Sequence, residues 1–465
     1  MGTDHATRGL HEDRKRRHSR GGKDVYLTNG PYALIRSQNI YNDGFHHGGL
    51  AYISEQHASE LANVEVLDDD VLLNITGDSV ARACQVDPSI LPARVNQHVA
   101  IIRPHPEELD PRFLRYYLVT PEMQVKLLSW AGSGGTRNAL TKGMIESFEV
   151  VAPKNINEQR AIAHILGTLD DKIELNRRMN ETLEAMARAL FKSWFVDFDP
   201  VRAKCRGEPM CSPQSGQVPK SDHAPHSGQA RRPAPTEWPQ HILDLFPDRF
   251  VDSELGEIPE GWEVATLSGI CEKPQYGYTA SASDETIGPR FLRITDINKR
   301  DWIEWESVPF CAIETLQREK YVLALGDIVI ARMADPGHGA LIEEVVEAVF
   351  ASYLIRFRPQ QPEFGRFLQY WLRSETYWDS VRSRQSGTTR ANLNAQVLGN
   401  FPLVVSDRGA IQQFSIFVGA LRNRVVANAR ESRTLANLRD TLLPKLISGE
   451  LRVKGAERFV EKVGA

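Results

Sequence analysis

The chain has 465 residues, 41% of them hydrophobic and 25% charged, which is typical of a folded globular protein long enough for two domains. No apolar stretch is long enough to cross a bilayer, and no apolar segment follows the basic N-terminal run, so a membrane span and a secretory signal are excluded and we expect a cytoplasmic protein. The net charge of −4 argues mildly against a protein that coats DNA non-specifically, but it allows local basic patches.

An internal repeat with a period of about 255 residues organises the chain. Asp70 and Asp78 recur as Asp327 and Asp335. Further matches follow in the same order in both halves, an order that chance does not produce: Val99–Pro104 with Leu354–Pro359, Phe113–Leu118 with Phe367–Leu372, and Thr136-Arg137 with Thr389-Arg390.

In chain order, residues 1–24 are polar and basic and predict a disordered tail, with phosphate binding as the alternative. Residues 25–153 predict a strand-rich domain, because β-branched runs such as Asp70–Ile75 alternate with turn residues. A short amphipathic helix is expected around Phe113–Leu118. Residues 154–198 predict one long helix, because apolar side chains recur at steps of four and three: Ile162, Leu166, Leu169, Ile173, Leu183, Ala187, Leu190 and Trp194.

The second half repeats this plan after a linker. Residues 199–253 are rich in Pro, Gly, Ser and His and predict a solvated, mobile connection. Residues 254–404 predict a second strand-rich domain, residues 405–449 a second long helix that Pro444 should kink, and residues 450–465 a tail.

One difference separates the halves. Gly256–Trp262 precedes Leu292–Ile297 in the second domain, whereas no similar segment precedes the matching Leu34–Ile40. We expect either that the first domain lacks its opening strand or that the chain begins internally to a longer gene.

The two long helices are expected to pair with each other as an antiparallel coiled coil; the alternative is that each packs only on its own domain. The predicted register places Asn180 beside Asn428 and Asn176 beside Ser432, and polar pairs of this kind fix register. The expected fold is therefore α+β, with two similar domains, two long helices and pseudo-two-fold symmetry.

The five cysteines are odd in number and scattered, so no disulfide framework is expected. Cys205 and Cys211 lie near His223 and His226, but their spacing matches no zinc pattern, and we expect no metal site.

The long-helix segments resemble a known family. Leu169–Asn176, continuing to Phe191–Pro200, is similar to the central conserved region of Type I restriction enzyme specificity subunits, and Leu438–Gly449 to their distal conserved region. Leu245–Phe250 and Gly256–Trp262 resemble the opening of their second target-recognition domain. The resemblance implies a subunit that binds double-stranded DNA and reads an asymmetric, two-part target. It also implies partners: two copies of a methyltransferase subunit, which carry S-adenosylmethionine and modify adenine, and motor-nuclease subunits, which use ATP and Mg.

Catalytic motifs are missing from the sequence. It has no adenine-methyltransferase motif and no phosphate-binding Gly-x-x-x-x-Gly-Lys-Ser/Thr loop. Asp335–Gly339 predicts a tight turn, and Asp170-Asp171-Lys172 predicts solvated charges on a helix rather than a nuclease site. We therefore expect a non-catalytic chain that binds no cofactor itself.

Candidate DNA-contacting residues are polar side chains in loops that flank the strands. Arg137 and Arg390 recur in both copies, so they favour loop bracing or phosphate contact, whereas positions that differ, such as Gln38 against Asp296 and Asn74 against Ala331, are better candidates for base readout. A coiled-coil scaffold without sequence preference is the competing function. The full candidate set is Arg36, Ser37, Gln38, Thr136, Arg137, Arg293, Thr295, Arg332, Arg384, Thr388, Thr389 and Arg390.

Overall fold

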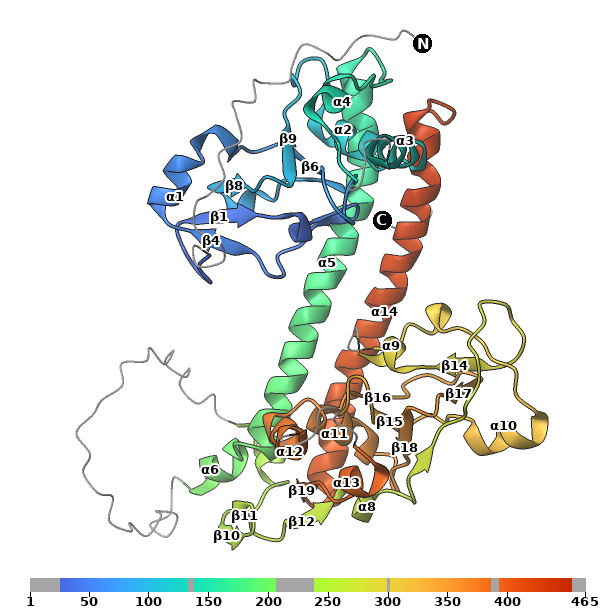
Figure 1. Ribbon diagram of the computed structural model, residues 1–465. Coiled ribbons are helices and arrows are strands. Elements are labelled where there is room, and N and C mark those ends of the chain that lie inside the picture. Colours follow the sequence, from blue (N-terminus) through green and yellow to red (C-terminus); the bar gives the residue numbers. More distant parts are fainter. Residues whose placement is uncertain (1–25, 133–137, 206–237, 299–301, 386–392, 454–465) are drawn as a thin grey trace. The chain divides into compact units, whose positions relative to one another are not determined.

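The computed structural model describes residues 26–132, 138–205, 238–298, 302–385 and 393–453 (Figure 1). The chain divides into two compact units: unit 1 comprises residues 1–178 and 428–465, and unit 2 comprises residues 179–427. Two helices have 40 residues each, α5 (Ile156–Phe195) and α14 (Arg408–Ile447). Each helix is divided between the two units.

Unit 1 contains two sheets and a short hairpin. The first sheet has the strand order β4-β1-β8-β5, in which β1 pairs parallel with β8 and antiparallel with β4. The second has the order β7-β6-β9 and is antiparallel throughout. The strands are β1 Tyr32–Ile35, β2 Ile40–Tyr41, β3 Gly44–Phe45, β4 Ala51–Ile53, β5 Glu65–Val66, β6 Val71–Asn74, β7 Ala83–Gln85, β8 Ala93–Val95 and β9 Val99–Ile102.

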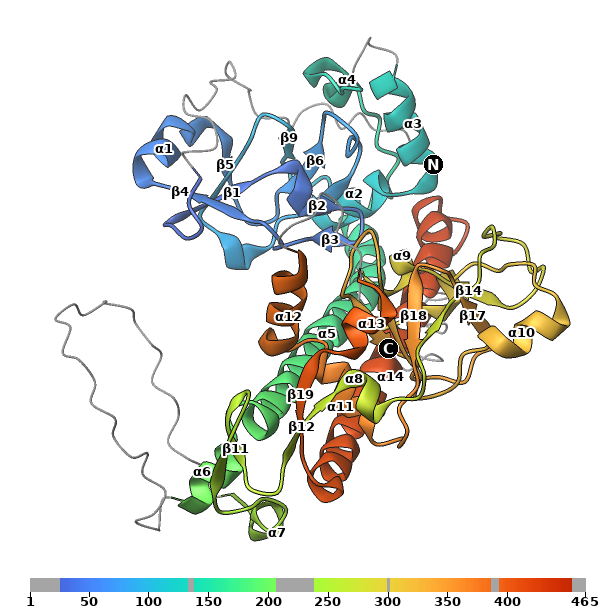
Figure 2. The ribbon, with the colours of Figure 1, turned by 60° about the horizontal axis from the view of Figure 1, so that its bottom comes forward.

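Unit 2 repeats this topology. Its parallel pair β14–β17 corresponds to β1–β8, and its antiparallel run β16-β15-β18 corresponds to β7-β6-β9, with β13 added beside β18. Figure 2 also shows β12 beside β19, and these two strands pair antiparallel. The strands are β10 Phe250–Ser253, β11 Gly256–Pro259, β12 Glu263–Thr266, β13 Gln275–Tyr276, β14 Arg290–Leu292, β15 Ile328–Ala331, β16 Gly339–Leu341, β17 Ala348–Phe350, β18 Leu354–Phe357 and β19 Pro402–Val405.

Short helices connect the strands, and local sequence explains where several of them begin. The Asp110 carboxylate caps α2 by accepting from the backbone N of Phe113 at 2.9 Å, and Pro111 follows as the first helical residue. Asn394 caps α13 in the same way. Helices of unit 1 are α1 Glu55–Glu60, α2 Pro111–Leu118, α3 Pro121–Gly132 and α4 Lys142–Glu146, with the 3-10 turn η2 Ser37–Asn39; those of unit 2 are α6 Asp199–Cys205, α7 Gln240–Leu243, α8 Leu267–Ile270, α9 Ile294–Ile297, α10 Thr315–Tyr321, α11 Phe364–Trp371, α12 Glu375–Gln385 and α13 Ala395–Gly399.

Within unit 1, the first part of α5 packs antiparallel against the last part of α14. Leu166 and Leu169 share one buried cluster with Leu435 and Leu442. The chain directions follow from two ion pairs, Glu158 with Arg452 at 3.1 Å and Asp170 with Arg439 at 2.7 Å. The α14 helix continues through Pro444 to Ile447, and the side chain of Leu446 is buried.

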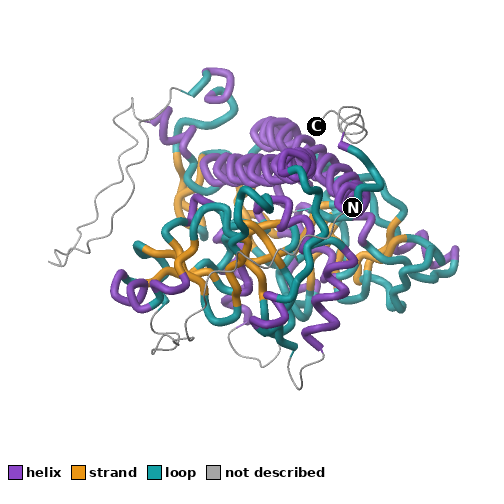
Figure 3. The backbone as a smooth tube through the Cα atoms, turned by 90° about the horizontal axis from the view of Figure 1, so that it is seen from above, coloured by secondary structure: helices purple, strands orange, loops and turns teal. Residues whose placement is uncertain are grey.

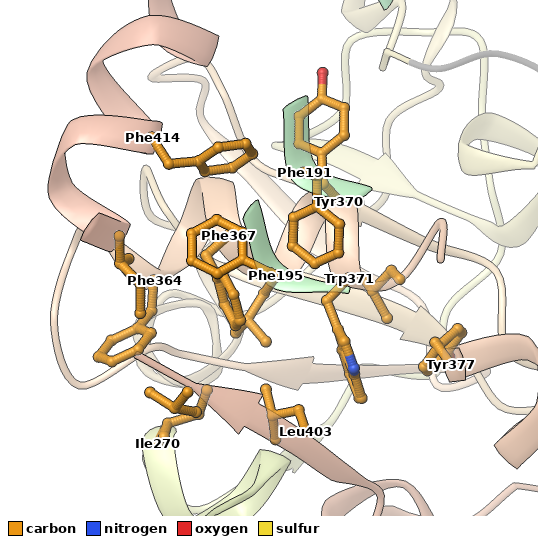
Figure 4. Packing of buried hydrophobic residues seen from close by; sticks show 14 of the residues in the cluster. Phe191, Phe195, Ile270, Phe364, Phe367, Tyr370, Trp371, Tyr377, Leu403 and Phe414 are labelled. Atoms are coloured by element: carbon orange, nitrogen blue, oxygen red, sulfur yellow. The ribbon is translucent and has the colours of Figure 1, made fainter. Parts of the chain in front are cut away.

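Within unit 2, the last part of α5 packs antiparallel against the first part of α14. Asn180 Nδ2 donates to the backbone O of Val425 at 3.3 Å, and the ring centroids of Phe191 and Phe414 lie 5.8 Å apart. These aromatic residues belong to a buried cluster that also takes in Phe367 on α11 (Figure 4). In both units, long-helix segments (purple in Figure 3) accompany a strand-rich part (orange), so the predicted α+β fold with repeated domains and antiparallel helices is confirmed.

The ends of the predicted linker are structured. Residues 199–205 form α6, and residues 250–253 form β10. Phe246 packs against Trp194 with centroids 5.2 Å apart, and burial of such apolar side chains explains why these ends fold. The rest of the predicted linker (206–237) and the predicted N-terminal tail (1–24) lie outside the described residues.

Candidate nucleic-acid interface

Two of the candidate arginines occupy the same place in the two units. Arg36 follows β1 and precedes η2, and Arg293 follows β14 and precedes α9. The backbone N of Arg36 donates to Oδ1 of Asn39 at 3.1 Å, and that of Arg293 donates to Oδ2 of Asp296 at 2.8 Å. In each unit, a polar side chain three residues on thus fixes the turn that the arginine opens. We call these the capping turns, residues 36–39 and 293–296.

The charges at the two capping turns differ. The Arg293 guanidinium forms two hydrogen bonds with Asp296, both at 3.0 Å, and these bonds raise the pKa of Arg293. The Arg36 guanidinium instead donates to the backbone O of Gly49 and lies over the Tyr26 ring at 5.3 Å. Among the residues that the structure describes, Arg36 contacts no carboxylate. Its positive charge is therefore less compensated than that of Arg293.

The exposed residue of each turn is Gln38 in unit 1 and Thr295 in unit 2. Gln38 Nε2 donates to the backbone O of Gly49 at 3.0 Å. Gly49 has a φ of +68°, and a Cβ there would lie 2.5 Å from Gln38 Nε2, so the contact requires glycine. Because the turns align from their arginines, Gln38 corresponds to Thr295, and the expected comparison of Gln38 with Asp296 is wrong.

Two further expected readout positions are interior. Asn74 and Ala331 are both fully buried. Asn74 Nδ2 donates to the backbone O of Ser37 at 2.9 Å, so it braces the capping turn against β6. The expectation that Asn74 and Ala331 face a base is therefore wrong, and Ser37 is half-buried within the braced turn.

Arg332 and Arg384 lie at the hairpin after β15 and on α12. The Arg332 guanidinium lies 5.1 Å from the centroid of the Tyr276 ring, and its Nε is buried without a hydrogen-bond partner among the described residues. Arg384 is exposed near the end of α12. Arg384 is thus accessible as it stands, whereas Arg332 is partly enclosed.

Five candidates, Thr136, Arg137, Thr388, Thr389 and Arg390, lie outside the described residues. The residues that follow them are described and occupy equivalent places. Leu140 N donates to the backbone O of Ile75 at 2.8 Å, and Leu393 N donates to that of Arg332 at 3.0 Å. In both units, the chain that leaves the Thr-Arg segment therefore rejoins the central strand at its hairpin end.

Unit 2 shows which elements meet at this end. Asn298, just after α9, donates from Nδ2 to Oδ2 of Asp335 at 3.1 Å. His338 lies 3.0 Å from Asp335 Oδ1 and edge-on to the Trp378 ring of α12. The capping turn, the β15–β16 hairpin and α12 thus meet on one side of the domain. Asn298 and His338 were missed from the sequence, although the repeat of Asp78 as Asp335 marked this hairpin.

The asparagines expected to set the register contact the opposite long helix within each unit. Asn176 Nδ2 donates to Glu431 Oε2 at 2.7 Å and to the backbone O of Asn428 at 3.5 Å. Its Oδ1 is buried without a hydrogen-bond partner among the described residues, so Asn176 makes no hydrogen bond with Ser432 there. Asn180 reaches the backbone of Val425. These asparagines therefore contact the backbone and a carboxylate on the opposite helix.

Asp170 is not the solvated charge that the sequence indicated. Its carboxylate accepts from Arg115 at 2.8 Å, from Tyr116 at 2.7 Å and from Arg439 at 2.7 Å. Burial alone would raise the pKa of Asp170, but the charges of Arg115 and Arg439 outweigh burial and lower it. The Asp170 carboxylate therefore has a structural role, because its oxygens already accept hydrogen bonds from three neighbouring side chains.

The described part of the chain holds no group of three or more His, Cys, Asp or Glu side chains placed to bind a metal ion. Cys205 is buried, and its thiol donates to the backbone O of Asp248 at 2.9 Å; Cys211, His223 and His226 lie outside the described residues. A search of the described helices for one long and apolar enough to cross a membrane finds none.

Known proteins resemble the chain along most of its length. The family described as Type I restriction modification DNA specificity domain matches residues 22–185. The HindI specificity subunit of Haemophilus influenzae is 26% identical over 90% of this chain and 94% of its own, and the MjaIX specificity subunit of Methanocaldococcus jannaschii is 26% identical over 73% and 69%. The crystal structure of a Type I restriction-modification S subunit from M. genitalium shares the fold, with a TM-score of 0.52, 15% identity and coverage of 93% of this chain and 92% of that one. The resemblance that the helix motifs indicated is thus confirmed: this chain is similar to a specificity subunit of a Type I restriction enzyme over 90% of its length, and the family model matches residues 22–185.

Proposed function

We propose that this chain is the sequence-specific DNA-binding subunit of a Type I restriction–modification complex and that it reads an asymmetric target made of two half-sites. One observation carries the proposal: a single strand topology occurs twice, and equivalent capping turns present different side chains. Unit 1 presents Arg36 and Gln38, where unit 2 presents Thr295 and an Arg293 bound to an acid. Because base readout depends on exposed donors and acceptors, this difference favours two different half-sites.

In this proposal the chain supplies the address and partners supply the chemistry. It binds two copies of a methyltransferase subunit, which hold S-adenosylmethionine and modify adenine, and motor-nuclease subunits, which use ATP and Mg for cleavage. The chain itself catalyses nothing and works in the cytoplasm. Labelled S-adenosylmethionine tests this division directly: methyl transfer to DNA should need the methyltransferase subunit, and transfer by the purified chain alone would contradict it.

Domain exchange tests whether each domain reads one half-site. Replacing residues 25–153 by the equivalent domain of a relative should change one half of the methylated site and leave the other half as it was, because each unit has its own core and its own capping turn. Replacing residues 254–404 is the matched reciprocal exchange. Methylated adenines are mapped across a genome that carries each version. An exchange that altered both halves together would mean that the domains read DNA jointly.

Point variants sharpen the same test. Gln38→Ala and Thr295→Ala remove the exposed side chain of one capping turn each, so each should relax base preference in one half-site only. Competition of labelled target DNA by random-sequence DNA is the second readout. If random DNA competes as well as the target, the chain is a scaffold without sequence preference, and the proposal fails.

A further inference from the structure

Each unit contains a cluster of buried charges where the domain meets both long helices. In unit 1 we define the Asp170 cluster as Asp170 on α5, Arg439 on α14, and Arg115 and Tyr116 on α2. Arg439 Nη1 lies 2.7 Å from Asp170 Oδ1, and Arg115 Nη1 lies 2.8 Å from Oδ2. All four side chains are mostly buried, so they bond to one another rather than to water.

In unit 2 we define the Arg422 cluster as Arg422 on α14, Glu184 on α5, Glu343 after β16, and Tyr370 on α11. Arg422 Nη1 lies 3.0 Å from Glu184 Oε2, and its Nη2 lies 2.6 Å from Glu343 Oε2. Tyr370 donates to Glu184 at 3.0 Å, as Tyr116 donates to Asp170. The side chain of Arg422 is 1% exposed, and those of both glutamates are 8% exposed.

The clusters share one polarity. In both units α5 supplies the acid, Asp170 or Glu184, and α14 supplies the base, Arg439 or Arg422. This is not what a repeated sequence would give by itself, because equivalent residues of two copies normally carry the same charge. Each unit therefore has its own buried ion pair between α5 and α14.

The repeat shows which ion pairs would be lost if two copies of the same long helix, from two copies of the chain, packed against each other. Aligned at their first residues, α5 and α14 pair Asp170 with Arg422, Glu184 with Ala436, and Ala187 with Arg439. If α14 of one copy packed against α14 of a second copy, Arg422 would meet Ala436 where Glu184 now lies. If α5 packed against α5, Asp170 would meet Ala187 where Arg439 now lies. Either pairing removes the partner on the opposite helix: Arg422 would keep Glu343, and Asp170 would keep Arg115 and Tyr116, but each would lose one buried ion pair, which is destabilising.

We propose that Asp170, Glu184, Arg422 and Arg439 are pairing-specificity residues, which select the pairing of α5 with α14 and reject the pairing of like helices from two copies of the chain. A chain with two similar halves needs such a device, because the apolar seam alone is compatible with both arrangements. Charged residues that gain a buried partner on the opposite helix only in the correct pair supply the discrimination.

A single introduced cysteine can detect the pairing of like helices, because it would form a disulfide between two copies of the chain. Asn176 contacts Asn428 across the helices of unit 1, and Asn428 is also the counterpart of Asn176 in the repeat. Like pairing of two α14 helices would therefore bring Asn428 of one copy against Asn428 of the other. In a Cys211→Ser background, Asn428→Cys should form a disulfide-linked dimer under mild oxidation only when like helices pair.

The decisive variant moves the acid from one helix to the other. Glu184→Ala with Ala436→Glu removes the partner of Arg422 on α5 and offers one on α14 of a second copy. The matched control, Glu184→Ala with Asn437→Glu, has the same composition of charge but places the new acid at an exposed neighbouring position. In the Asn428→Cys background, the yield of disulfide-linked dimer should rise about tenfold or more over the control, a shift of about 1.4 kcal/mol in pairing preference.

Equal yields from the moved-acid variant and its control would overturn the proposal, as would an unaltered cluster that cross-links as strongly as the moved-acid variant. If removing Glu184 prevents folding, Ala436→Glu alone keeps the native ion pair and should still cross-link more than Asn437→Glu alone. No difference between these two single variants would equally refute the proposal.

Discussion

Replacing Arg422 by methionine should destabilise unit 2, because two buried carboxylates lose their shared arginine; Glu184 keeps Arg373 and Tyr370, and Glu343 keeps Arg366. The guanidinium binds Glu184 at 3.0 Å and Glu343 at 2.6 Å, and its side chain is 1% exposed. Removing one partner of a buried ion pair costs about 3–5 kcal/mol. For a unit of about 250 residues, each kcal/mol lowers Tm by roughly 2–4 °C, so the expected loss is on the order of 6–20 °C.

The stability lost through Arg422→Met should be smaller at acidic pH. Burial alone would raise the pKa of Glu184 and Glu343, but neighbouring arginines, Arg422 among them, hold both below the ordinary value of 4.5. In the native protein these carboxylates therefore stabilise fully above that value, and their contribution is lost as pH falls through the lowered folded pKa. Without Arg422 the folded pKa of each carboxyl moves up. The difference between native and variant is then largest near neutral pH and decreases as the carboxyls take up protons.

Thermal unfolding of the purified chain, followed by calorimetry near neutral pH and about two pH units lower, measures both effects. Arg424→Met is the matched control, since Arg424 is exposed two residues away on the same helix, and its change should stay within about 0.5 kcal/mol. An Arg422 variant no less stable than the control would refute the ion-pair account.

Three further outcomes follow from other buried groups. Asp327→Asn should cost on the order of 3 kcal/mol in unit 2, measured as a fall in Tm, because the carboxylate is 1% exposed and accepts two guanidinium hydrogen bonds. Asn176→Leu should leave Tm unchanged or raise it, since its Oδ1 is already buried without a partner among the described residues, and Glu431 keeps an ion pair with Lys172. Burial raises the pKa of the Cys84 and Cys271 thiols to about 12, so mass spectrometry after iodoacetamide treatment at mildly alkaline pH should find both unmodified in the folded chain and modified once it is denatured.

Much of the fold could be predicted from local sequence. The apolar steps of four and three mark α5 and α14, and β-branched runs mark β6 and β15, because secondary structure follows from the periodicity of buried side chains along the chain itself. The internal repeat then extends each assignment to its counterpart, and the two units indeed share the order β7-β6-β9 and β16-β15-β18.

The candidate interface was predicted only in part. Arg36 and Arg293 recur at one position of the repeat, and the structure places both at equivalent capping turns. Their different charge environments could not be read from the sequence, since Gly49 and Asp296 are partners only through the fold. Asn74 illustrates the same limit: a polar residue that differs between the copies suggests readout, yet it is fully buried and binds Ser37.

The sequence by itself determined the repeat, the positions of the strands and long helices, and the resemblance to the specificity subunits. These depend on patterns within short stretches of chain. Only the tertiary structure decided which charged side chains are buried in ion pairs. Asp170 and Glu184 both look like exposed helix residues in the sequence, but each meets an arginine of α14 more than two hundred residues away. Burial of a charge depends on what folds against it, and an ion pair exists only when two distant segments meet in the correct register.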